Sequence, residues 1–137
     1  MIKKVMNDGT ALERFKKMVE LQSGDWEATQ KDDFINVKYT HEIKAEKDGF
    51  FEVTSSVGVG IAAMKIGAGR ETKEDDIDFS AGIYLNKKTN EQVSKDEVVI
   101  TMYSNKEIPS KIIEDVKNSI QINEKTIENK IILGKLK

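Results

Sequence analysis

The chain has 137 residues, of which 38% are hydrophobic and 34% are charged, a composition that suits one compact domain with a single core. Its net charge of -2 argues against a nucleic-acid binder, because neutralising many phosphates needs a clustered excess of Lys and Arg. The absence of cysteine excludes disulfides, a thiol nucleophile and thiolate metal ligands. We expect a cytoplasmic protein, since the N-terminus lacks the apolar region of a signal peptide and no apolar run could span a bilayer.

The first predicted element is a helix that begins near Thr10. The apolar residues of its inward face recur at helical spacing: Leu12, Phe15 and Val19. Thr10 and Glu13 have the spacing of a capping box, and Gly24 is placed to end the helix in the left-handed conformation. Residues 1–33 are therefore predicted to form a helical segment and a linker, with the main domain over residues 34–137.

Alternating apolar residues predict antiparallel strands in that main domain. The strand-like runs cover 35–45, 50–53, 82–85, 98–102 and 131–136. Asp48 and Gly49 lie between the first two runs, and the Asp-Gly pair predicts a hairpin that joins them.

Two short helices are predicted among these strands. One spans residues 61–66 and is closed by Gly67, and the other begins near Pro109, whose missing N–H suits a first helical turn. The inward residues of the second helix are Ile112, Ile113, Val116 and Ile120. Strands and helices without strict alternation indicate an α+β domain.

A Gly-Ala-Gly-Arg turn followed by mixed acidic and basic residues fills the stretch from Gly67 to Asp78, with Gly82 just beyond it. This stretch resembles the G-A-G-R-x-x-K-x-D-x-I-D-x-x-x-G run near the C-terminus of thymidine and pyrimidine-nucleoside phosphorylases. Residues 7–25 are similar to the same family's S/N-x-G-x-A-L-E-x-F helix, and the resemblance covers roughly residues 7–122. We predict a structural role for the residues that carry the motif: Gly67, Gly69, Arg70, Lys73, Asp75 and Asp78. Gly67 and Gly69 are expected to hold backbone conformations that are unfavourable to residues with a Cβ, as a helix C-cap followed by a tight turn.

The resemblance implies a hammerhead-type domain that contains a barrel-sandwich of two small antiparallel sheets. It implies that the chain is the C-terminal part of a pentosyltransferase, a homodimer at full length, which cleaves thymidine, uridine or deoxyuridine by reversible phosphorolysis in pyrimidine salvage. In the family pattern, the phosphate co-substrate and a potassium ion are bound by an N-terminal catalytic portion, which would be the partner of this chain. We therefore expect no catalytic, cofactor-binding or metal-binding residues here, and a role in structure and domain closure.

Two segments depart from the family pattern. Thr89-Asn90-Glu91-Gln92 stands where the family has a Gly-Asp turn, and Ser94-Lys95-Asp96 lacks the expected glycine. Both segments fall in predicted turns, where glycine supplies backbone conformations that other residues rarely adopt.

Two short patterns suggest other functions. Residues 58–63 match the G-x-G-x-x-G/A dinucleotide fingerprint, but too few residues follow before Asp78 to form a crossover helix, so we interpret the small residues as close packing. Residues 62–66 resemble the hairpin on which biotinyl and lipoyl carriers present a modified lysine. A carrier domain modified at Lys65, and a stand-alone binding module of the same fold, are the alternatives to a phosphorylase fragment.

The remaining candidates have plain interpretations. The acids between residues 71 and 78 lack the glycine and distal glutamate of an EF-hand loop, so we predict a solvated acidic loop paired with Arg70 and Lys73. His41 is the only histidine, which excludes a histidine metal cluster, and it is predicted to lie at a strand surface.

Overall fold

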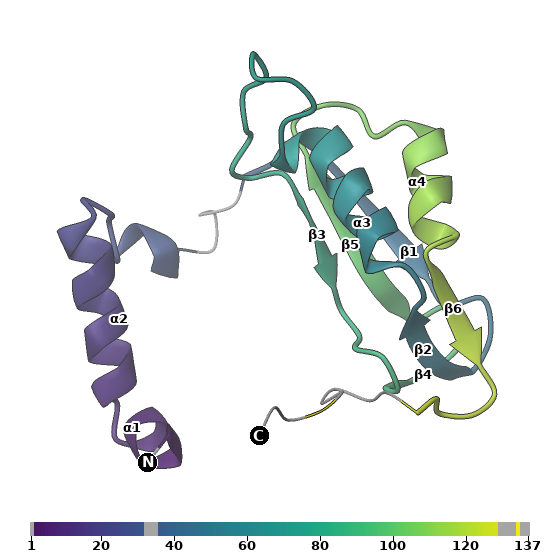
Figure 1. The fold of residues 1–137 in the computed structure, drawn as a ribbon, viewed down its shortest axis with the longest axis horizontal. Coiled ribbons are helices and arrows are strands. Elements are labelled where there is room, and N and C mark those ends of the chain that lie inside the picture. Colours follow the sequence, from purple (N-terminus) through teal and green to yellow (C-terminus); the bar gives the residue numbers. More distant parts are fainter. Residues whose placement is uncertain (1, 32–35, 129–133, 135–137) are drawn as a thin grey trace. The chain divides into compact units, whose positions relative to one another are not determined.

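The computed structural model describes residues 2–31, 36–128 and 134, and the chain divides into two compact units, Met1–Asn36 and Val37–Lys137 (Figure 1). The predicted strand over 131–136 lies outside the described residues except for residue 134. Ile35, where the first predicted strand begins, also lies outside them. Each described helix is too short or too polar to cross a lipid bilayer.

The first unit is helical. Its elements are α1 (Ile2–Asn7), α2 (Thr10–Leu21) and the short 3-10 turn η1 (Ala28–Gln30). The predicted capping box is wrong, because Thr10 is the first helical residue and Gly9 precedes it in the left-handed region, with φ 82°. The Thr10 N–H and Oγ both donate to the Asp8 carboxylate, at 3.1 and 2.5 Å. The side chain that accepts an N–H at the start of the helix is therefore that of Asp8 and not that of Thr10.

The end of α2 is a Schellman motif. The Gly24 N–H donates to the Val19 C=O at 2.8 Å, and the Ser23 N–H donates to the Glu20 C=O at 2.9 Å. Ser23 holds the left-handed conformation, with φ 62°, so the prediction of a left-handed Gly24 is wrong. Glycine is needed at position 24 for space, because a Cβ there would lie 2.7 Å from Val19 Cγ1.

The second unit contains two three-stranded sheets in which every pair is antiparallel. The first sheet has the order β1 (Tyr39–Lys44), β5 (Val98–Ser104) and β3 (Gly82–Leu85). The second has the order β4 (Gln92–Val93), β2 (Gly49–Val53) and β6 (Ile120–Asn123). The α+β prediction is confirmed, and the sheets of the described residues do not close into a barrel (Figure 1).

The predicted hairpin at Asp48 and Gly49 is wrong, because the strands on either side belong to different sheets. Gly49 has φ 157°, and a Cβ there would lie 2.4 Å from the Asn123 backbone oxygen. The Asp48 carboxylate accepts the Lys95 N–H at 2.7 Å. The Asp-Gly pair is therefore a corner at which the chain passes from one sheet to the other, and glycine is required for the close approach to β6.

Helix α3 (Ser56–Ala63) begins earlier than predicted, because the Ser55 side chain caps it by accepting the Gly58 N–H at 3.0 Å. It packs beside α4 (Ser110–Lys117) (Figure 1). A Cβ at Gly58 would lie 2.3 Å from the Ser119 Oγ, so glycine allows α3 to approach the end of α4. The Ser119 C=O also accepts the N–H groups of Thr54 and Ser55, at 2.9 and 3.2 Å.

A single core connects both sheets with both helices. Its buried members come from both sheets, both helices and the segments beside them: Ile43, Ala45, Phe51, Ala62, Ile66, Val93, Val99, Ile100, Met102, Ile112 and Val116. Full burial of one such large side chain stabilises the fold by about 1.5–3 kcal/mol. Ile120, predicted as the last inward residue of the second helix, instead begins β6.

Candidate functional site

The motif from Gly67 to Asp78 forms a loop whose two ends are joined by a backbone hydrogen bond. Helix α3 continues into the helical turn η2 (Met64–Ala68), where Gly67 has φ 117° and ψ -10°. The Gly67 C=O accepts the Asp78 N–H at 2.9 Å. The positive φ favours glycine and redirects the chain out of the helix.

Gly69 serves the loop in another way. Its φ of -152° is extended backbone, so the prediction of an unfavourable conformation at this position is wrong. A Cβ at Gly69 would lie 3.0 Å from Met64 Cγ and 3.3 Å from Met64 Cα. The close return of the chain over Met64 is therefore what requires a small residue.

Asp78 joins the end of the loop to the end of β5. Its Oδ1 accepts the N–H and the Oγ–H of Ser80, at 3.0 and 2.7 Å, and its Oδ2 accepts the Asn105 side-chain N–H at 2.9 Å. Asn105 in turn accepts the Lys38 N–H at 3.2 Å. The hydrogen bonds from Ser80 and then Asn105 lower the pKa of Asp78, so it is held as an acceptor and not as a proton donor.

Asp75 stabilises the middle of the loop. Its Oδ2 accepts the backbone N–H groups of Thr72 and Glu71, at 2.8 and 2.9 Å, and these bonds, Thr72 first, lower the pKa of Asp75. The predicted ion pairing of the acids with Arg70 and Lys73 is wrong for the part of the chain that the structure describes, where neither residue forms an ion pair. Two backbone donors already bind one oxygen of the Asp75 carboxylate, Oδ2.

An open hollow of about 530 Å³ lies beside this loop. Its charged lining is mainly acidic: Glu71, Glu74, Asp75, Asp76 and Asp78, against Lys65 and Lys106. Such a surplus of carboxylates repels phosphate and other anions. The described residues contain no group of three or more His, Asp or Glu side chains that could hold a metal ion.

The structure also places the three other candidates from the sequence: Lys65, residues 58–63 and His41. Lys65 is exposed on the helical turn η2, so the hairpin on which a carrier domain presents its lysine does not occur at this position. The dinucleotide fingerprint at residues 58–63 lies inside α3 and not in a strand-to-helix turn. His41 is half-exposed on β1, opposite Met102 of β5.

Two matching turns flank the short strand β4. In each, the fourth residue's N–H donates to the first residue's C=O: Glu91 to Lys88 at 2.9 Å, and Glu97 to Ser94 at 3.1 Å. The third residue of each turn has a positive φ, 74° at Asn90 and 65° at Asp96. The departures from the family's glycines therefore fall at positions where Asn and Asp adopt the left-handed conformation themselves.

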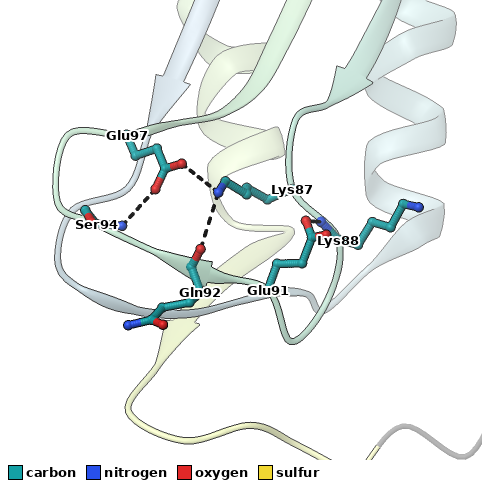
Figure 2. Close-up of polar contacts among 6 residues, drawn as sticks. All are labelled: Lys87, Lys88, Glu91, Gln92, Ser94 and Glu97. Carbon is teal, nitrogen blue, oxygen red and sulfur yellow. Dashed lines mark hydrogen bonds and ion pairs between the residues drawn. The ribbon is translucent and has the colours of Figure 1, made fainter.

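The glutamate that ends each turn also binds its first backbone N–H (Figure 2). Glu91 Oε2 accepts the Lys88 N–H at 2.7 Å, and Glu97 Oε2 accepts the Ser94 N–H at 2.9 Å. Lys87 connects the turns, since its Nζ lies 2.6 Å from Glu97 Oε1 and 3.3 Å from the Gln92 C=O. We did not predict this arrangement, although the shared Asn/Asp-Glu ending of the two turns is visible in the sequence.

Comparison with known proteins gives a family match over most of the second unit, including the motif loop. The family model for the pyrimidine nucleoside phosphorylase C-terminal domain matches residues 50–123. A thymidine phosphorylase of Metamycoplasma hominis is 38% identical over 137 residues, which cover 99% of this chain and 50% of that protein. A pyrimidine-nucleoside phosphorylase of Staphylococcus aureus (strain USA300) is 36% identical over 128 residues, which cover 93% of this chain and 30% of that protein. The chain thus spans half or less of the length of these relatives.

Proposed function

The chain belongs to the pyrimidine nucleoside phosphorylase C-terminal domain family, and from this we propose that it is the C-terminal module of an enzyme that cleaves pyrimidine nucleosides with phosphate. In that reaction phosphate attacks C1′ of the pentose while the bond to the base breaks, which gives the free base and a pentose 1-phosphate. We propose that the module has a structural and domain-closing role and is inactive alone. The phosphate site, a potassium ion and the homodimer contacts belong in this proposal to the rest of the enzyme.

The observation that carries the proposal is the set of hydrogen bonds made by the acidic residues of the motif loop. Two of its carboxylates are hydrogen-bonded to the fold: Asp75 to backbone N–H groups, and Asp78 to Ser80 and Asn105. Phosphorolysis needs donors and cations around phosphate and around the departing base. Acidic residues dominate the hollow beside the loop, so it would repel both phosphate and a departing base that carries negative charge. We therefore assign the loop a structural role.

The surface of α2 supports docking on another part of the enzyme. Its apolar side chains include Leu12, Phe15, Met18 and Leu21, each about half exposed or more. Within the same unit Phe15 contacts Trp26 edge to face, with ring centroids 5.8 Å apart. Exposed apolar stripes of this kind mark contact surfaces. We propose that the N-terminal catalytic portion of the enzyme covers this one.

The test is a chimera of the Staphylococcus aureus relative in which the matching C-terminal region is replaced by residues 1–137 of this chain. We expect the chimera to cleave thymidine or uridine with phosphate, while the purified chain alone shows no turnover. A matched chimera carrying Leu12→Ser and Met18→Ser on the α2 surface should lose activity through loss of docking. Turnover by the chain alone would overturn the proposal, as would a folded chimera without activity.

A further inference from the structure

A second hollow, of about 220 Å³, shares no lining residue with the hollow beside the motif loop. It is formed by the end of β1, the start of β5, the end of α4 and the strand β6. Its floor is aliphatic and buried: Ile43, Ala45 and Val99. Ile120 and Ile122 form a half-buried wall. The hollow therefore offers an apolar interior that reaches the core.

The position of the hollow between two strand edges explains why it stays open. β1 is an edge of the first sheet and β6 is an edge of the second, and the two strands are not paired with each other. The floor residue Ala45 has a small side chain, which leaves the space between the two strands unfilled.

The mouth of the hollow has the opposite character to its floor. Its charged residues are Lys44, Lys47 and Lys117 together with Glu46. None of the three lysines forms an ion pair with a residue that the structure describes. In a chain of net charge -2 this is a local cationic excess, and an ammonium group at the edge of an apolar surface favours a carboxylate.

We propose that this hollow binds a small amphipathic monocarboxylic acid, with its apolar body on the Ile43 and Val99 floor and its carboxylate among the lysines. The volume corresponds to about seven water molecules, which an aliphatic body of about eight carbons fills. Burying that body removes apolar surface from water, and the lysines supply orientation and selectivity for an anion. This site is independent of the proposed phosphorolysis.

The test is calorimetric titration of the purified full chain with octanoate, and with octan-1-ol as the neutral match. We expect octanoate to bind more tightly than octan-1-ol, and more weakly as salt is added. Lys44→Gln with Lys117→Gln should weaken octanoate binding by about two- to fivefold per lysine and leave octan-1-ol unchanged. Lys95→Gln removes one lysine charge from an exposed turn outside the hollow and should leave the binding of both compounds unchanged.

A second variant tests the apolar part of the site. Ala45→Leu places a larger side chain in the hollow and should abolish binding of both compounds, with a cooperative thermal transition showing that the variant is folded. If Ala45→Leu does not fold, the lysine pair decides alone. Absence of octanoate binding to the native chain would overturn the proposal, and so would equal binding by the double-lysine variant.

Discussion

The side-chain amide of Asn90 binds both backbone groups of Ile127. Its Nδ2 donates to the Ile127 C=O at 2.9 Å, and its Oδ1 accepts the Ile127 N–H at 2.8 Å. The Asn90 N–H donates to the Phe51 C=O at 2.8 Å. One residue with a positive φ therefore connects a turn, the central strand β2 of the second sheet and the segment that follows β6.

Asn90→Gly should lower the free energy of unfolding by about 1–3 kcal/mol. Glycine keeps the positive φ and relieves its strain, but it removes both side-chain bonds and leaves the half-buried Ile127 groups without these partners. Urea denaturation followed by circular dichroism measures the change. A midpoint at or above that of the native chain would show that the Ile127 contact contributes nothing.

Asp96→Gly is the matched change in the second turn and should have a different outcome. Asp96 has a similar φ, 65°, but its side chain makes no hydrogen bond among the described residues. Relief of backbone strain should therefore offset the greater freedom of glycine in the unfolded chain, and we expect a change of less than about 1 kcal/mol. A loss as large as that of Asn90→Gly would mean that any glycine in these turns is harmful.

Gly67→Ala should destabilise the chain by about 1–3 kcal/mol, because alanine is strained at φ 117°. Gly60→Ala is the control, since Gly60 lies inside α3 with open space where a Cβ would be. That change should stabilise the chain by about 0.5–1 kcal/mol through helix propensity. Thermal denaturation of the two variants should thus move in opposite directions, and equal shifts would contradict a special role for Gly67.

The stability of the chain should fall in acid partly through Asp78. Because hydrogen bonds lower the pKa of Asp78 in the folded state, its contribution is present above the unfolded pKa and is lost as the pH falls through the folded pKa. Asp78→Asn should therefore be less stable near neutral pH and show a smaller loss below about pH 4 than the native chain. Unfolding measured across this range checks the slope. An unchanged pH profile would show that Asp78 does not contribute.

The sequence predicted the α+β class and most strands because local alternation and helical spacing are short-range patterns. It did not predict which strands pair. Asp48 and Gly49 have the composition of a hairpin, yet the contact that decides their conformation is with Asn123, more than 70 residues away. Ile120 follows Val116 at helical spacing, so the start of β6 was assigned to the preceding helix.

In the motif loop, too, the sequence predicted the local feature and missed the features that depend on contacts in space. Gly67 was correctly expected to have an unfavourable backbone conformation, since a helix that ends before a turn commonly needs a left-handed residue. Arg70 was expected to pair with the acids, but the backbone N–H groups that bind Asp75 are not visible as a sequence pattern. The assignment of Gly69 failed because its neighbour in space, Met64, sets a limit on volume and not on φ.

The contacts around Ser119 determine how the second unit can move. Its C=O binds the chain just before α3, its Oγ binds the Asp115 C=O at 2.8 Å, and Gly58 of α3 approaches the same Oγ. One buried residue, Ser119, thus connects helix α3, helix α4 and the paired strands β2 and β6. Bending between these elements would break several of these bonds together, so this part of the unit would move as a rigid body in the domain closure that we propose.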